Sequence, residues 1–297
     1  MVSSQEINHL LKSARLMKQH FKKGTAPRLL KNKVLGMIFQ KSSTRTRISF
    51  EVAMVQLGGQ AIYLSANDLQ LKRGETIADT AQTLSRYLNG ITARVYSHQD
   101  LVDLANNATI PVINALSDYE HPCQALADLL TIYEKKKTFR GIKITYLGDG
   151  NNVCHSLLLG VAQVGGQITV ATPPDYSPSQ EVIEKAKTNA QSTGAEIEII
   201  NDPFKAVKKA HIIYTDVWTS MGQEEEYKKR LKTFQDYQIN HSLLKRARSD
   251  VLVMHCLPAH RGEEITAEVI DGPHSIVFDQ AENRLHIQKA LLAQVLK

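Results

Sequence analysis

The sequence lacks long hydrophobic runs and has few cysteines, and both scarcities exclude classes of protein. No stretch approaches the roughly 18 apolar residues of a membrane-spanning helix, so no membrane partner is expected. The N-terminal segment lacks the unbroken apolar region of a secretory signal peptide. The three cysteines, Cys123, Cys154 and Cys256, are odd in number and widely spaced. They argue against a disulfide framework and predict a protein of the reducing cytoplasm.

Proline and glycine are also scarce, with 9 and 16 residues in a chain of 297, and 42% of the residues are hydrophobic. This composition excludes collagen-like and disordered chains and is typical of a globular protein. The N-terminal residues predict an amphipathic helix, whose apolar face holds Ile7, Leu10, Leu11, Ala14 and either Leu16 or Met17.

Acidic residues are outnumbered by basic ones, 30 against 36, which gives a formal net charge of +6. A positive charge can attract nucleic acid, but the basic runs at 135–137, 228–230 and 245–248 are scattered and carry no interleaved aromatic residues. Solvated helix faces explain such runs better, so no nucleic-acid partner is predicted. A small anionic substrate stays compatible with the charge.

Short apolar runs rich in β-branched residues alternate with helical patterns along the chain. The predicted strands cover 34–39, 60–64, 91–96, 110–114, 142–147, 168–171, 196–200, 212–215 and 251–254. The predicted helices cover 45–57, 76–88, 122–133, 153–164, 180–193 and 282–296. This alternation predicts an α/β fold with doubly wound parallel sheets, covered by helices on both faces. A charged interruption over 134–141 predicts the boundary between two such domains.

In such folds ligands bind beyond the C-terminal ends of the strands, and several of these ends carry polar residues. After the first strand, residues 43–46 open a helix with three hydroxyls and an arginine. Backbone N–H groups at a helix start bind anions, and an arginine fork grips two phosphate oxygens at once. Arg47 is expected instead to pair with Glu51 one helical turn further on.

Three further polar residues stand near strand ends in the first half. Arg94 lies in a predicted strand, and His121 and Gln124 flank Pro122 at a helix start. Each alone is more often a surface or capping residue. Together an arginine, a histidine and an amide could polarise a carbonyl oxygen.

Two loops follow strands of the second half. The run 148–152, Gly-Asp-Gly-Asn-Asn, is similar to a dinucleotide-binding turn, but Val153 replaces the third glycine. The interpretation as a nicotinamide dehydrogenase therefore depends on an incomplete motif. Asp216 precedes a loop that ends at Gly222. This arrangement fits a cationic ligand beneath a mobile flap, or else a capping Asp beside a buried Trp218.

The last loop runs from His255 to Gly262. Its Cys256 either has a pKa lowered by neighbouring His and Arg or is buried and inert. His255, Cys256 and His260 match no structural zinc spacing, so no metal is predicted. The Leu257–Pro258 bond is a candidate cis peptide.

Five motifs stand in one order along the chain: SSTRTR, HPCQ, GDGNN, DVWTSMG and HCLPAHRG. Together they resemble those of the carbamoyltransferases, over about residues 33–288. The first two are shared by the aspartate and ornithine enzymes, whereas D-x-x-x-S-M-G and H-C-L-P point to the ornithine carbamoyltransferases. The run DLQLKRGE at 68–75 also resembles bacterial ornithine enzymes.

This resemblance implies two sets of substrate-binding residues and neither a cofactor nor a metal. The set for carbamoyl phosphate is Ser43, Thr44, Arg45, Thr46, Gln70, Arg94, His121, Gln124, Cys256, Leu257 and Arg284. The set for L-ornithine is Asn152, Asp216, Ser220 and Met221. The catalytic members would be Arg94, His121 and Cys256.

The resemblance also implies a domain arrangement and an assembly. A carbamoyl phosphate-binding domain is expected over residues 1–136 and an ornithine-binding domain over 137–280. The final helix, 281–297, would pack back on the first domain, and the active site would lie in the cleft between the two. Family members form homotrimers or multiples of trimers, and Gln70 would reach across a subunit boundary.

The implied reaction transfers the carbamoyl group of carbamoyl phosphate to the side-chain amine of L-ornithine. The products are L-citrulline and phosphate, in arginine biosynthesis. Asp216 and Cys256 would hold the ammonium group, and either Cys256 or the departing phosphate would take its proton. Two alternatives stay open: a transferase for putrescine, N-acetylornithine or aspartate, and a silent phosphate-binding homologue.

Overall fold

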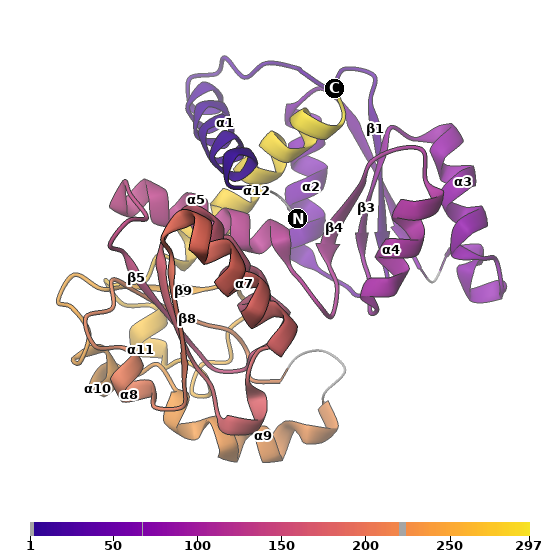
Figure 1. Cartoon of the computed structure of the whole chain (residues 1–297). Helices are drawn as coiled ribbons and strands as arrows, with labels where there is room; N and C mark the ends of the chain where they lie inside the picture. Colours follow the sequence, from indigo (N-terminus) through magenta and orange to yellow (C-terminus); the bar gives the residue numbers. More distant parts are fainter. Residues whose placement is uncertain (1–2, 67, 220–223) are drawn as a thin grey trace. The chain divides into compact units, whose positions relative to one another are not determined.

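The computed structural model describes residues 3–66, 68–219 and 224–297, which form two compact units. The N-terminal unit comprises residues 5–130 and 282–297, and the C-terminal unit comprises residues 131–281 with Ser3 and Ser4. Figure 1 shows the chain with its elements labelled. Each unit is built on one parallel sheet, as the alternation of strand and helix patterns predicted.

The N-terminal unit has a four-stranded sheet in the order β2-β1-β3-β4. The strands are β1 (Val34–Phe39), β2 (Gln60–Ser65), β3 (Gly90–Arg94) and β4 (Val112–Leu116). The helices are α1 (Ser4–Lys22), α2 (Thr44–Gln56), α3 (Ile77–Tyr87), α4 (His98–Asn107) and α5 (Pro122–Lys136), followed at the end of the chain by α12 (Val277–Val295).

Alternating side chains of β1 supply the cores on the two faces of this sheet. Leu35, Met37 and Phe39 pack in one cluster with apolar residues of α2 and α12. Ile38 packs in the other cluster with residues of α3 and α4. Helices therefore cover both faces, which confirms the doubly wound arrangement for this unit.

The C-terminal unit has a five-stranded parallel sheet in the order β7-β6-β5-β8-β9. The strands are β5 (Lys143–Leu147), β6 (Gln167–Ala171), β7 (Glu196–Ile200), β8 (Ile212–Thr215) and β9 (Leu252–His255). Its helices are α6 (Asn152–Val164), α7 (Gln180–Thr193), α8 (Pro203–Ala206), α9 (Tyr227–Phe234), α10 (His241–Leu244) and α11 (Ala267–Ile270).

The predicted elements are present, and the differences have local causes. The strand expected over 110–114 begins at Val112, because Pro111 has no N–H to donate to a sheet. In α1, Leu16 is 47% exposed while Met17 is partly buried, so Met17 is the correct choice of the two. Lys18 is buried there unexpectedly, and its Nζ donates to Asn283 Oδ1 at 2.7 Å. The helices α4 and α9 were not predicted.

Among the described residues, no helix is both long enough and apolar enough to cross a membrane.

Candidate functional site

The first group of site residues lies at the point where the strand order of the N-terminal sheet reverses. Chain order runs outward from β1 to β2 on one side and through β3 to β4 on the other. Loops leaving the carboxyl ends of β1, β3 and β4 therefore meet at one edge, where open α/β sheets bind ligands. Residues 43–46 follow β1, Arg94 is the last residue of β3, and His121 and Gln124 follow β4.

The start of α2 carries the residues of the predicted anion site. Ser43 is the N-cap, and its hydroxyl accepts a hydrogen bond from the Thr46 N–H at 3.3 Å. Thr46 is buried, whereas Thr44 is exposed and Arg45 is partly exposed. The Arg47 Nε donates to Glu51 Oε1 at 2.9 Å, which confirms that Arg47 belongs to an exposed helical ion pair.

Arg284 of α12 connects this predicted anion site to α5. Its Nη2 donates to Thr46 Oγ1 at 3.0 Å, and its Nη1 donates to Gln124 Oε1 at 2.6 Å. All three side chains are buried. Residues from the beginning, middle and end of the N-terminal unit are thus held together by hydrogen bonds.

Arg94 and His121 add two buried polar groups to the same unit, with exposed fractions of 6% and 5%. Burial lowers the pKa of His121 well below 6.5, and the charges of Arg284 and Arg94 lower it further. The imidazole is therefore neutral at physiological pH. A neutral ring can donate one hydrogen bond to a carbonyl oxygen without adding to the positive charge of the two arginines.

Gln70 is not gathered with these residues. It opens a short 3-10 turn at Gln70–Arg73, and its side chain is exposed. In the described part of the chain, no hydrogen bond joins it to Thr46, Gln124 or Arg284.

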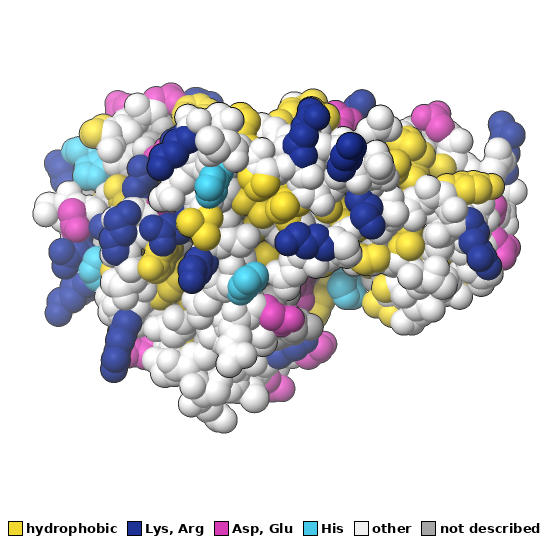
Figure 2. Space-filling view, turned by 90° about the horizontal axis from the view of Figure 1, so that it is seen from above, with side chains coloured by type: hydrophobic (Ala, Val, Ile, Leu, Met, Phe, Trp, Pro, Cys, Tyr) yellow, Lys and Arg dark blue, Asp and Glu magenta, His cyan; other side chains and the backbone are white. Residues whose placement is uncertain are grey.

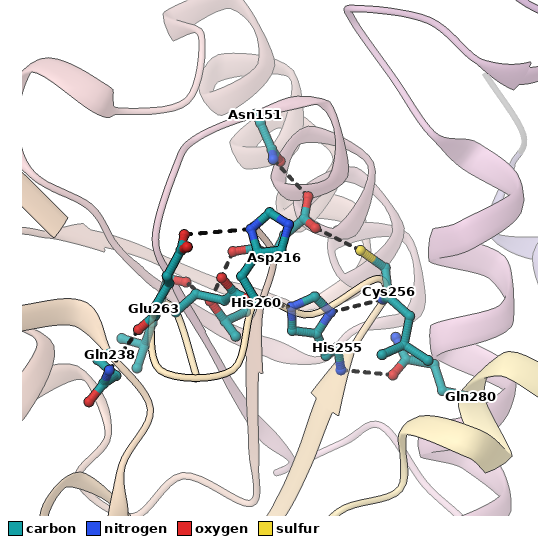
Figure 3. Close-up of polar contacts among 12 residues, drawn as sticks. Asn151, Asp216, Gln238, His255, Cys256, His260, Glu263 and Gln280 are labelled. Carbon is teal, nitrogen blue, oxygen red and sulfur yellow. Dashed lines mark hydrogen bonds and ion pairs between the residues drawn. The ribbon is translucent and has the colours of Figure 1, made fainter. Parts of the chain in front are cut away.

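The second group of site residues lies at the corresponding edge of the C-terminal sheet. The adjacent strands β5, β8 and β9 lead into Asn151, Asp216 and Cys256 respectively. The Asn151 amide donates to Asp216 Oδ2 at 2.8 Å, and the Cys256 thiol donates to Asp216 Oδ1 at 2.9 Å (Figure 3). Asp216 is a nearly buried carboxylate with a donor on each oxygen, and carboxylates of this kind bind cationic groups.

A buried acid–histidine pair holds the loop that carries Cys256. The His255 Nδ1 accepts from the Leu257 N–H at 2.8 Å, so the ring proton lies on Nε2, which donates to Glu264 Oε1 at 3.1 Å (Figure 3). His255 N also donates to Gln280 Oε1 at 2.9 Å. The Leu257–Pro258 bond is cis, as predicted.

A second buried ion pair anchors the loop after Asp216. Arg230 Nη1 donates to Asp149 Oδ2 and to the Trp218 carbonyl oxygen, both at 2.9 Å. Burial raises the pKa of Asp149 to about 6, although the Arg230 charge opposes this shift. Trp218 is buried, as one of the two interpretations of this loop expected.

The three other predicted ornithine-binding residues are Asn152, Ser220 and Met221. Ser220 and Met221 lie outside the described residues. Asn152 is the first residue of α6, and the neighbouring Asn151 contacts Asp216.

Packing around Gly150 explains why a glycine stands in this turn, so nucleotide binding is not needed to explain it. A side chain at this position would collide with the backbone of Ser177 and Pro178. The second glycine is therefore required by packing, and Val153 at the third position is buried in α6. The turn does not support the dehydrogenase alternative.

Two groups of described residues bring potential metal-binding atoms within 4.8 Å of one another: Asp216 with His255 and Cys256, and His260 with Glu263 and Glu264. Both ring nitrogens of His255 are already engaged, so the first group lacks a free imidazole. In the second group, Glu264 Oε1 already accepts a hydrogen bond from the backbone N–H of His260 at 2.6 Å. We derive no metal chemistry from either group.

Two family models together match most of the chain. The family model described as the aspartate/ornithine carbamoyltransferase carbamoyl-P binding domain matches residues 1–134, and the model of the Asp/Orn binding domain matches residues 140–295. The ornithine carbamoyltransferase of Pyrococcus horikoshii is 59% identical over 98% of this chain and 92% of its own length.

Solved structures give the same result. The ornithine carbamoyltransferase from Pyrococcus furiosus has a TM-score of 0.96 and 58% identity, over 99% of this chain and 94% of that chain. The enzyme from Thermus thermophilus has a TM-score of 0.89 and 43% identity, over 99% and 96% of the two chains. The chain therefore belongs to the aspartate/ornithine carbamoyltransferase family.

Proposed function

We propose that this protein transfers the carbamoyl group of carbamoyl phosphate to the side-chain amine of L-ornithine, forming L-citrulline and phosphate. The observation that carries the proposal is the Asp216 carboxylate, which receives hydrogen bonds from Cys256 and Asn151. A nearly buried carboxylate at a strand end suits a substrate with a cationic side chain and disfavours aspartate as the acceptor.

The N-terminal unit would bind carbamoyl phosphate. Hydroxyls and N–H groups of residues 43–46 would receive the phosphate at the start of α2, together with Arg284. Arg94 and neutral His121 would donate to the carbamoyl oxygen. Negative charge develops on this oxygen when the amine attacks, and preorganised donors stabilise it.

The C-terminal unit would bind L-ornithine through Asp216, Asn152 and the loop that includes Ser220 and Met221. Cys256 and Leu257, on the loop fixed by His255, would complete the reacting centre. Two of these residues lie outside the described part of the chain, so their roles rest on the motif.

The amine must lose a proton before it can attack. An amine with the pKa of lysine is neutral in about one molecule in a thousand at pH 7, a deficit of about 4 kcal/mol. Asp216 stabilises the ammonium form and cannot explain its deprotonation. Cys256 already donates its own proton to Asp216 Oδ1, which favours the departing phosphate as the final proton acceptor.

The test is citrulline formation from carbamoyl phosphate by the purified protein, with L-ornithine, putrescine, N-acetylornithine and aspartate compared as acceptors. We expect the highest kcat/KM with L-ornithine. A higher value with putrescine would reassign the acceptor, and no product with any acceptor would support a silent phosphate-binding homologue. The word "anabolic" in the name of the Pyrococcus furiosus relative supports synthesis as the direction.

We also propose a homotrimer, or a multiple of trimers, located in the cytoplasm. Large apolar side chains are exposed on the N-terminal unit at Ile48, Val55, Ile62 and Tyr87, and exposed Gln70 could reach a neighbouring copy. Sedimentation equilibrium of the purified chain tests the assembly. The three free cysteines suit a reducing compartment.

A further inference from the structure

Asp128 is a buried carboxylate to which the reaction described above gives no role. It lies in α5 one helical turn after Gln124, and its exposed fraction is 0%. Its Oδ1 accepts a hydrogen bond from Gln124 Nε2 at 2.7 Å. Burying a carboxylate is costly even when it is paired, so its position beside a substrate-binding amide needs an explanation.

The contacts of Gln124 fix the orientation of its amide. On one side lies the Asp128 carboxyl group, whose Oδ1 accepts a hydrogen bond from the amide nitrogen, and on the other lies the Arg284 guanidinium, which only donates hydrogen bonds. The amide nitrogen must therefore face Asp128. The amide oxygen faces Arg284, whose second nitrogen holds Thr46.

We propose that Asp128 is a positioning residue that sets the specificity of this site for an acyl phosphate carrying N–H groups. By binding the amide nitrogen, Asp128 presents Gln124 Oε1 to the acyl group as an acceptor. This oxygen has two lone pairs, and the Arg284 bond occupies one. The other accepts from the carbamoyl NH₂. The inference rests on the proposed function, because it assumes that Gln124 meets the carbamoyl group.

Acetyl phosphate is the natural probe, because it replaces the carbamoyl NH₂ with a methyl of similar size and keeps the phosphate. A methyl against Gln124 Oε1 leaves a buried acceptor without its partner, which makes acetyl phosphate bind about tenfold or more weakly. If the Gln124 amide were flipped, its N–H groups would face the acyl group. The preference for carbamoyl phosphate over acetyl phosphate would then be lost.

The experiment measures two dissociation constants by titration calorimetry without ornithine, one for acetyl phosphate and one for carbamoyl phosphate, and takes their ratio. Asp128→Leu removes the acceptor for Gln124 Nε2 at similar volume, and the ratio should fall at least fivefold. Asp128→Asn keeps an oxygen that can accept from Gln124, and the ratio should stay within about twofold of the wild-type value. Binding of inorganic phosphate, which has no acyl group, should be the same in all three proteins.

A structural role alone gives a different result. If Asp128 only supports α5, Asp128→Leu weakens both acyl phosphates equally, and an unchanged ratio overturns the proposal. Gln124→Leu should lower the ratio by itself, and Asp128→Leu should lower it no further in that background. A further fall would also contradict the proposal. If Asp128→Leu does not fold, Asp128→Ala provides the same comparison with less added apolar bulk.

The failure of this inference can be told apart from the failure of the proposed function. Wild-type protein that forms no citrulline overturns the proposed function. Wild-type protein that forms citrulline, while Asp128→Leu keeps the wild-type ratio of dissociation constants, overturns only the role of Asp128.

Discussion

Individual side chains give the two candidate binding groups opposite charges. The N-terminal unit offers buried donors at Arg94, His121 and Arg284, and the C-terminal unit offers the Asp216 carboxylate. Carbamoyl phosphate is an anion and the ornithine side chain is a cation, so under the proposed function each group would meet a substrate of opposite charge. The division predicts that mutations in one unit affect the kinetic constants of one substrate more than those of the other.

Arg94→Ala should lower kcat by two decades or more. Removing one donor to a developing oxyanion typically costs about 2.7–4 kcal/mol of transition-state stabilisation. Steady-state kinetics checks this, with Arg47→Ala as the matched control, because Arg47 lies in the same unit but pairs with Glu51 at the surface. Unchanged turnover in Arg94→Ala would remove this residue from the reaction.

Cys256 should be the only cysteine that reacts with iodoacetamide in the folded protein. Cys123 and Cys154 are 1% and 0% exposed. Burial raises the pKa of Cys123 to about 11 and the pKa of Cys154 well above 9, so both stay as thiols. Peptide mass spectrometry should find label on Cys256 alone, and ornithine should slow its labelling. Equal labelling of Cys123 or Cys154 would contradict their burial.

Cys256→Ser should raise KM for ornithine and lower kcat, while KM for carbamoyl phosphate changes little. The serine hydroxyl can still donate to Asp216, but the shorter bonds of oxygen move the donor. Steady-state kinetics with each substrate varied in turn measures the split. A change confined to carbamoyl phosphate would contradict a role for Cys256 beside Asp216 in ornithine binding.

The sequence could identify residues whose chemistry stands in a motif, and these include Arg94, His121, Gln124 and Asp216. It could not identify Asn151, Glu264 or Asp128 as partners. Asn151 contacts Asp216 across 65 positions, and Glu264 contacts His255 across nine positions in a loop, where no regular period reveals the pair. Asp128 carried a weak local signal, because it stands one helical turn after Gln124.

At the scale of elements, α1 and α12 contact each other through polar groups that are buried. Lys18 of α1 bonds Asn283 at 2.7 Å and lies 3.5 Å from Glu282. His286 of α12 lies 3.1 Å from the same Glu282. Buried ionisable groups on a helix contact make the stability of that contact depend on pH.

His286 should make the protein less stable in mild acid. Burial lowers the pKa of His286 from 6.5 to about 4, although Glu282 opposes the shift. Below pH 6.5 the unfolded chain binds a proton at this position and the folded chain does not, so stability falls as the pH decreases toward 4.

Urea unfolding at pH 7.5 and pH 5.0 measures this effect. From pH 7.5 to 5.0, the wild type should lose about 1–2 kcal/mol more stability than His286→Met. His9→Gln on the exposed side of α1 is the control and should behave like the wild type. Equal losses in the wild type and His286→Met would show that another group controls acid stability.

The strands were predictable because buried parallel strands are short runs of β-branched and apolar residues, as in Ile212–Thr215. The missed helix α4 has the sequence HQDLVDLANN and buries only Leu101 and Leu104, so its core-facing residues span a single helical turn. The helices α8, α10 and α11 have four residues each, which is too short for a helical period to appear. Tertiary packing selects helix at these positions.

At the scale of the whole molecule, positive charge is concentrated near the start of the chain. Residues 7–50 contain 11 Lys and Arg and no Asp or Glu. Figure 2 shows Lys and Arg side chains spread widely over the face that it draws. Positive charge around an anion site raises the local concentration of an anionic substrate.

The apparent affinity for carbamoyl phosphate should therefore fall with ionic strength. Raising NaCl from 20 to 500 mM shortens the screening length to less than about 5 Å, and KM for carbamoyl phosphate should rise several-fold. KM for ornithine should change less. A second salt with a different anion separates screening from competition by chloride. A salt-independent KM for carbamoyl phosphate would exclude long-range attraction.

In the proposed reaction, one protein joins carbamoyl phosphate and L-ornithine at the side-chain nitrogen of ornithine. The most direct measurement follows carbon-13-labelled carbamoyl phosphate and L-ornithine by carbon-13 and phosphorus-31 NMR. We expect a ureido carbon bonded to the δ-nitrogen of citrulline to appear together with an equal amount of inorganic phosphate. Phosphate released without the ureido signal, or a carbamoyl group on the α-nitrogen, would contradict the proposed reaction.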